Sequence, residues 1–304
     1  MERIFIQKLA SKIEQYRKGR GQGRGLPVTS FALHTGHPLF RLLSSIALIV
    51  LASGCEAEGG EEELPPEPLS IPFAVTVGGA PFQCGEPYSA LGSLGSEVRF
   101  GDLRLYIHQV ELLTADGQAT PLILEEDGLW QQGDVALLDF EDGCENGTRE
   151  LNNNIRGEIV PRAYTAIRFR IGLPAALNSP ETILEERGSP LNQSSMYWTW
   201  NSGYKFMRLD AIGAPFRFHL GASGCSADFE CAQENIPVIT LEGWREGESE
   251  ITLDLAQLLE ASNLEENSPG SAPGCMGDVN DPDCPPIFQR LGLAAGEPLA
   301  FQLQ

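Results

Sequence analysis

The chain has 304 residues, with 21 Lys and Arg against 42 Asp and Glu and a formal net charge of −21 at pH 7. A surface this acidic repels phosphate backbones, which excludes nucleic acid as a partner. The charge suits an exported protein that meets cations or a basic partner.

Residues 1–54 are predicted to be a signal peptide, with the true start site left open. Residues 1–41 are rich in Lys and Arg, and Leu42–Ser53 is apolar. That apolar run is shorter than the ~20 residues needed to cross a bilayer. It ends in Leu51–Cys55 (LASGC), which resembles a bacterial lipobox. Cys55 is therefore expected to carry a lipid that anchors the mature chain in the bacterial cell envelope, on the periplasmic side or the cell surface; an uncleaved membrane anchor is the alternative.

The segment that follows Cys55 is acidic and rich in Gly and Pro. Such a composition cannot bury enough apolar surface to offset the entropy lost on ordering. Residues 55–70 are therefore expected to be a tether, followed by one domain over residues 71–304.

Six cysteines remain after Cys55, an even number that predicts disulfides in an exported chain. They are Cys84, Cys144, Cys225, Cys231, Cys275 and Cys284. Their spacing predicts local Cys225–Cys231 and Cys275–Cys284 bridges, which leaves Cys84 to pair with Cys144. Thiolate binding of a metal is the alternative, although the sequence has no CxxC pair.

Short β-rich runs separated by Gly, Pro, Asn and Asp predict an all-β fold, a single disulfide-stapled antiparallel β-sandwich. The expected strands are Phe73–Val77, Val98–Leu113 with a break near Gly101, Thr120–Leu124, Val135–Phe140, Tyr164–Leu173, a hairpin over residues 196–209, Phe216–Leu220, Val238–Leu241 and Glu250–Leu255. Pro180–Gly188 and Leu255–Leu264 are the helical candidates, and Glu265–Pro286 is expected to be a loop pinned by a disulfide.

The hairpin carries the densest aromatic pattern in the chain, Met196–Asp210 (MYWTWNSGYKFMRLD). In an extended strand, residues two apart share a face, so Met196, Trp198 and Trp200 are expected to project together. A turn is expected over Asn201–Gly203, with Tyr204–Leu209 as the returning strand. A buried hairpin that only packs is the alternative.

After the leader, His108 and His219 are the chain's remaining histidines, and each lies opposite the apolar face of a predicted strand. Two imidazoles with a soft sulfur or an aromatic amine nearby suit a low-coordinate Cu(I) site better than zinc, which takes four ligands. The alternative is two hydrogen-bonded strand histidines without a metal. The spacing leaves open whether the two rings meet.

Ten ordered motifs lie between about Phe73 and Leu258. They begin at Cys84 (CGEPY), Leu103 (LRLYIH), Gly128 (GLWQ), Leu137 (LLDFE), Cys144 (CENGT), Phe169 (FRIGLP), Pro190 (PLN), Met196 (MYWTW), Gly203 (GYKFMRLD) and Phe218 (FHLGASGC). This series resembles the MbnP-like family of copper-binding proteins, which accompany MbnH, a MauG-like di-haem protein. Cys84, Cys144, Cys225 and Cys231 look like the four family cysteines. Cys275 and Cys284 look like an added pair.

The resemblance implies that a di-haem cytochrome partner oxidises the first Trp of the WxW motif to kynurenine and that the product binds one Cu(I). Trp198 would be the modified residue and Trp200 a relay. His108, His219 and the kynurenine would be the copper ligands, with Met196 or Met207 as a thioether alternative. Where the family often has Leu-Asn-His, this chain has Leu177-Asn178-Ser179, which removes a third imidazole.

The expected function is that of a lipid-anchored, monomeric Cu(I)-binding protein in copper homeostasis. An enzyme is not expected, because no set of nucleophile, histidine and acid is evident. The alternative is a surface lipoprotein of the same fold with a structural or adhesive role and no metal.

Overall fold

The computed structural model describes residues 64–144, 147–178, 186–198, 203–226, 230–278, 280–294 and 298–304. The chain divides into two compact units, Met1–Gly59 and Gly60–Gln304, and every described residue belongs to the second. The predicted signal peptide and Cys55 lie outside the described residues. No helix within the described ranges is long and apolar enough to cross a membrane.

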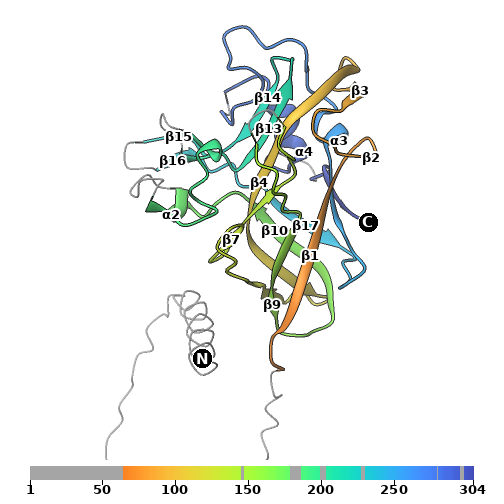
Figure 1. Ribbon diagram of the computed structural model, residues 1–304, viewed down its shortest axis with the longest axis vertical. Coiled ribbons are helices and arrows are strands. Elements are labelled where there is room, and N and C mark those ends of the chain that lie inside the picture. The colour runs from red at the N-terminus through yellow and green to blue at the C-terminus, as the bar shows by residue number, and fades with distance from the viewer. Residues whose placement is uncertain are drawn as a thin grey trace, which may run out of the picture. The chain divides into compact units, whose positions relative to one another are not determined.

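The larger sheet is built around β4 (Ser96–Thr114), in the strand order β14-β13-β4-β10-β17 (Figure 1). Its other members are β3 (Pro87–Leu91), β5 (Ala119–Pro121), β7 (Gln131–Gln132), β8 (Val135–Asp139), β10 (Tyr164–Ile171), β13 (Met207–Ile212), β14 (Arg217–Leu220) and β17 (Val238–Glu242). The break expected near Gly101 is wrong. Asp210 pairs with Asp102 and Ala211 pairs with Phe100, so Gly101 is the extra residue of a bulge within a continuous strand.

The smaller sheet has the order β19-β18-β1-β9-β6, which joins strands from both ends of the domain. Its members are β1 (Glu67–Val77), β2 (Ala80–Pro81), β6 (Ile123–Leu124), β9 (Asn154–Ile159), β18 (Ile251–Asp254) and β19 (Phe301–Leu303). β1 and β18 run parallel, and the other pairs are antiparallel.

Aromatic rings join the two sheets in the core. The ring of Phe169 in β10 lies 5.6 Å from that of Phe73 in β1 and 5.7 Å from that of Phe301 in β19, both in edge-on contacts. These contacts belong to one continuous cluster of buried apolar side chains. The predicted all-β sandwich is therefore confirmed.

Residues 186–198 and 203–206 form a further layer, which covers the polar face of β4. The Tyr106 hydroxyl donates to the carbonyl oxygen of Pro190 at 2.9 Å, and its ring lies 5.8 Å from that of Tyr204. Arg104, Tyr106 and His108 are consequently as buried as the apolar side chains on the opposite face of the strand.

The predicted hairpin is shorter than expected. β11 (Tyr197–Trp198) pairs with β12 (Gly203–Tyr204), and Trp198 lies opposite Gly203. Met196 belongs to a 3₁₀ turn, η2 (Ser194–Met196). The expected single strand Tyr204–Leu209 is wrong, because the backbone from Met207 onward pairs with β4 and β14 instead of with β11.

Helices are few and short. α3 (Leu255–Leu259) begins at Asp254, whose side chain accepts from the amide of Ala256, and it ends five residues before the predicted Leu264. Most of the Pro180–Gly188 candidate, residues 180–185, lies outside the described residues. α2 (Ala175–Asn178) and α4 (Pro285–Arg290) were not expected from the sequence. On one flank, α2 lies beside the small hairpin of β15 (Ser223–Cys225) and β16 (Cys231–Gln233) (Figure 1).

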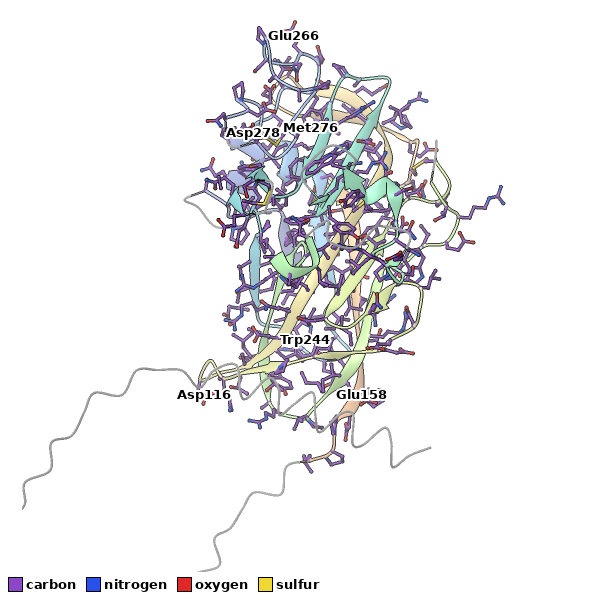
Figure 2. All side chains as sticks on the ribbon, turned by 90° about the vertical axis from the view of Figure 1, so that its left-hand side faces the viewer. Asp116, Glu158, Trp244, Glu266, Met276 and Asp278 are labelled. Carbon is purple, nitrogen blue, oxygen red and sulfur yellow. A yellow bond between two sulfur atoms is a disulfide. The ribbon has the colours of Figure 1, made fainter. Side chains whose placement is uncertain are left out.

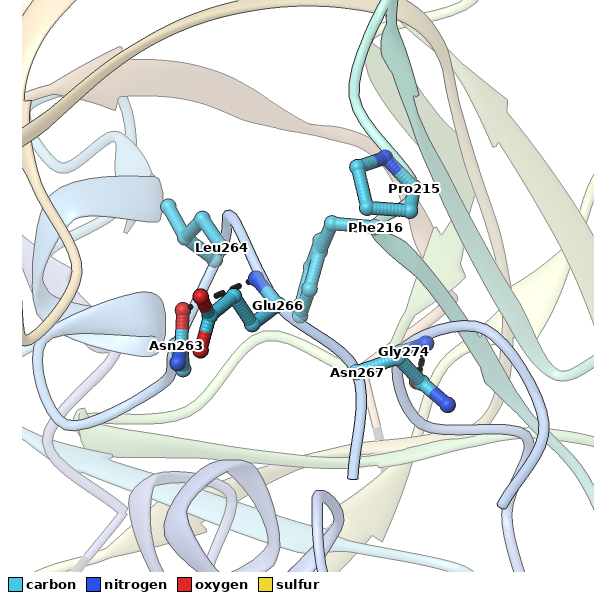
Figure 3. A pocket seen from close by; sticks show the side chains of 7 residues that line it. All are labelled: Pro215, Phe216, Asn263, Leu264, Glu266, Asn267 and Gly274. Carbon is cyan, nitrogen blue, oxygen red and sulfur yellow. Dashed lines mark hydrogen bonds between the residues drawn. The ribbon is translucent and has the colours of Figure 1, made fainter. Parts of the chain in front are cut away.

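The disulfides pair as the spacing predicts: Cys84–Cys144, Cys225–Cys231 and Cys275–Cys284. The last of these lies in the C-terminal loop. Figure 2 shows Glu266, Met276 and Asp278 of that loop near one end of the domain, and Asp116 and Glu158 near the other. Beside Phe216 the loop forms a shallow pocket (Figure 3), where Asn263 and Asn267 use their side-chain oxygens to bind the amides of Glu266 and Gly274. These amide oxygens stabilise the loop itself.

Candidate functional site

His219 lies in β14 and is held by a carboxylate. Its Nε2 is 2.7 Å from Oδ1 of Asp210 in the neighbouring strand β13. Burial would raise the pKa of Asp210, but the hydrogen bond from His219 and the nearby Arg208 lower it below its ordinary value. Burial lowers the pKa of His219, although Asp210 opposes the effect. The ring is therefore uncharged near neutral pH, with its proton on Nε2 and its lone pair on Nδ1.

His108 is held by a backbone carbonyl. Its Nδ1 is 2.8 Å from the carbonyl oxygen of Gly172, and because a carbonyl only accepts, this nitrogen carries the proton. Burial lowers the pKa of His108 to about 4, an effect that Arg170 reinforces. The side chain is 2% exposed. His108 is therefore also neutral, with its lone pair on Nε2.

The sheet register places the two histidines apart on the same face. Arg104, Arg208 and His219 form one row across β4, β13 and β14, whereas His108 lies four residues further along β4. Strands lie ~4.8 Å apart and rise ~3.3 Å per residue, so the two Cα atoms are roughly 16 Å from each other. The structure does not bring the two imidazoles together.

Trp198 is the predicted site residue that lies next to a histidine. The centroids of the Trp198 and His219 rings are 6.4 Å apart, with their planes tilted by 48°. The indole is 7% exposed and packs against the backbone of Gly221, where a Cβ atom would lie only 2.4 Å from Cζ3 of the indole. Glycine at position 221 therefore allows Trp198 to lie over the end of β14.

A buried group of charged side chains fixes the segment that leads into Trp198. The Arg104 Nη1 donates to the hydroxyl of Ser195 at 2.9 Å. The Lys205 Nζ donates to the backbone carbonyl oxygen of the same serine at 2.8 Å. The Arg208 Nη1 also reaches that carbonyl and forms an ion pair with Asp102 at 3.0 Å. Burial lowers the pKa of Lys205 to about 8. Three cationic side chains thus hold the backbone immediately before the aromatic hairpin.

The other predicted site residues have different surroundings. Met196 is fully buried in the hydrophobic core. Trp200, the predicted relay, lies outside the described residues, as does Cys55. Asp210 orients His219, and Asp139 accepts from the amide of Glu141. Across the described ranges, no group of three or more His, Cys, Asp or Glu side chains could hold a metal ion.

Sequence reasoning missed two residues that shape the site. Ser195 looks like an ordinary loop serine, and Gly221 looks like part of a flexible Gly-Ala-Ser-Gly stretch. Each acts through partners ten or more residues away in the chain. The sequence contains no local signal for either contact.

Comparison with known proteins supports one family. A family model described as MbnP matches residues 66–277. A solved structure described as MbnP from Methylosinus trichosporium matches with a TM-score of 0.67 and 30% sequence identity, over 78% of this chain and 93% of that one. A search of curated proteins finds no match.

Proposed function

Because the chain belongs to the MbnP family, we propose that it is an exported Cu(I)-binding protein of copper homeostasis. Its metal site would form at Trp198 and His219 after oxidation of Trp198 to kynurenine. Copper is here the cargo that the protein carries, and the chain is not itself an enzyme.

The observation that carries this proposal is the neutral His219 ring beside Trp198. Asp210 accepts a hydrogen bond from the Nε2–H of His219, which leaves the Nδ1 lone pair for a soft cation; metal-binding histidines generally have this kind of outer support. Opening the indole would add an aniline nitrogen to a side chain whose ring centre lies 6.4 Å from that of His219, so that the two residues could share one ion. Two donors suit Cu(I), whereas a zinc site takes four.

Conversion of Trp198 to kynurenine would break the C2–C3 bond of the indole, release C2 as formate and remove four electrons, with water as the oxygen source. We assign the removal of these electrons to a MauG-like di-haem cytochrome that passes them to a peroxide. Trp198 is 7% exposed, so its electrons would leave without entry of the haem into the sandwich; Trp200, two residues further along the chain, is the relay we propose. Lipidation of Cys55 would keep the protein in the cell envelope near such a partner.

Mass spectrometry of protein from its native host tests the modification. Conversion of tryptophan to kynurenine adds about 4 Da, which is expected on the peptide that contains Trp198. Unmodified Trp198 in cells that express the di-haem partner would contradict the proposal and favour the structural or adhesive alternative.

Copper titration tests the ligands in the matured protein. His219→Ala is expected to weaken Cu(I) binding by at least a hundredfold, because a neutral donor is lost. His108→Gln is the matched control and is expected to retain the affinity, because His108 lies too far along β4 to share the ion. Full affinity in His219→Ala would overturn the assignment of the site.

A further inference from the structure

A second cavity lies on the flank formed by α2, β16 and the end of β10. It has a volume of about 320 Å³, and Leu173, Phe206 and Ile236 contribute apolar wall. Ala175 and Asn178 of α2 line it from one side, and Cys231 of the Cys225–Cys231 bridge lines it from another. Cavities of this size with mostly apolar walls hold small organic molecules.

The charged side chains that line the cavity are both acidic. Glu230 and Glu234 are exposed. Neither carboxylate forms an ion pair with a cation within the described residues. Among the lining residues the structure describes, no Lys, Arg or His offsets their charge. An apolar cavity with two unneutralised carboxylates at its margin favours a ligand that is apolar and positively charged.

The remaining polar side chain that lines the cavity, Asn178, already forms a hydrogen bond within the protein. The Asn178 Oδ1 accepts from the backbone amide of Tyr204 at 2.8 Å, which fixes the amide side chain. Orientation of a ligand would therefore depend on the two glutamates.

From this combination we infer that the cavity binds a small organic cation, with its apolar body against Leu173, Phe206 and Ile236 and its ammonium group facing Glu230 and Glu234. The site is separate from the donors proposed for copper. It contacts their surroundings, however: Phe206 packs on Gly172, whose carbonyl holds His108, and Ala222 follows the Gly221 that supports Trp198.

Calorimetric titration of the folded domain with 4-phenylbutylammonium tests this inference, with the neutral 4-phenylbutanol as the matched ligand. Saturable binding of one ammonium ligand is expected. The double variant Glu230→Gln/Glu234→Gln should bind the ammonium ligand about tenfold more weakly, because two exposed charges are lost, and should bind the alcohol as the original chain does.

A control pair separates the local charge from the acidity of the whole surface. Glu242 and Glu246 are exposed and lie at and beyond the far end of β17, and Glu242→Gln/Glu246→Gln should leave binding unchanged. Ala175→Phe, which fills the cavity from exposed α2, should abolish binding of both ligands. Absence of saturable binding, equal weakening by the two double variants, or unchanged binding in Ala175→Phe would overturn the inference. His219→Ala should bind the ammonium ligand normally, so this result is independent of the copper proposal.

Discussion

Each of the two histidines donates one ring N–H to a fixed acceptor, and they use opposite nitrogens. His219 donates from Nε2 to a carboxylate, and His108 donates from Nδ1 to a carbonyl. A ring held in this way has one tautomer and a lone pair at a known atom. The two histidines differ in the side chain beside the ring: the ring of Trp198 lies next to His219.

The low pKa of His108 should appear in the pH dependence of stability. In the folded chain this pKa is about 4 instead of 6.5, so between these values the unfolded chain binds more protons and stability falls as the pH falls. From pH 7 to pH 5 this effect should amount to about 2 kcal/mol. Urea unfolding of the original chain and of His108→Gln at both pH values measures it.

The original chain must be compared with His108→Gln because a second buried group changes stability with pH in the opposite direction. Burial raises the pKa of Asp139 to about 7, so the folded chain keeps that proton longer and loses stability as the pH rises. His108→Gln removes the histidine contribution alone. An identical pH dependence in both chains would show that His108 titrates normally.

Gly221 is expected to be intolerant of even one methyl group. In Gly221→Ala the new Cβ would lie 2.4 Å from the indole of Trp198 and 2.6 Å from the carbonyl oxygen of Tyr204. The crowding should cost about 1–3 kcal/mol and displace the indole from His219. Unfolding free energies and the fluorescence of Trp198 would report both changes.

Gly188→Ala is the matched control for this prediction. Its Cβ would meet the end of the Gln132 side chain, which can move away, so the variant should be close to the original chain in stability. Equal effects of the two substitutions would contradict the role given to Gly221.

The element that carries Trp198 is too short to be stable alone. β11 and β12 contribute two residues each, whereas an isolated two-stranded hairpin is marginal even when longer. Contacts from outside the hairpin therefore hold it: the three cations on Ser195 at one end, and Asn178 of α2 on the amide of Tyr204.

Asn178→Ala should loosen this hairpin. The buried amide of Tyr204 would lose its acceptor, at a cost of about 1–3 kcal/mol. Faster hydrogen exchange is expected at the amide of Tyr204, with little change in β4. Asn153→Ala, at an exposed position beside β9, serves as the control and should leave exchange at Tyr204 unchanged. Unchanged exchange in Asn178→Ala would show that the hairpin is held elsewhere.

The strand pattern of the sequence was informative where a strand consists mainly of apolar, β-branched and aromatic residues. β1, β8, β10, β14, β17 and β18 each overlap a predicted run. β9 was missed, because Asn154–Ile159 mixes Asn, Arg, Gly and Glu with its apolar residues. The hairpin was assigned a wrong returning strand, because strand propensity at Met207 does not indicate which neighbour its backbone will pair with.

At the scale of the whole domain, the three disulfides close loops of very different length. Cys84 and Cys144 are 60 residues apart and link the segment between β2 and β3 to the segment after β8, whereas Cys225 and Cys231 are six residues apart within one hairpin. In the loop-entropy account, the bridge that closes the longer loop removes more entropy from the unfolded chain and therefore stabilises the folded domain more.

Removal of the long bridge should therefore be the more damaging change. Cys84→Ser/Cys144→Ser is expected to lower the free energy of unfolding by about 4 kcal/mol, and Cys225→Ser/Cys231→Ser by about 2 kcal/mol. Urea unfolding under oxidising conditions compares the two variants. A larger loss from the short bridge would mean that local packing, not loop closure, dominates.

The sequence by itself determined the β-sandwich, the three disulfides and the family, because alternation of residues, cysteine spacing and short motifs are local properties of a chain. It also identified His108, His219 and Trp198 as candidates. Only the tertiary structure decided that Trp198 lies against His219 while His108 is further along β4, and which nitrogen each histidine leaves unprotonated. Those outcomes depend on strand register and on contacts with Asp210, Gly172 and Gly221, which join segments that the sequence keeps apart.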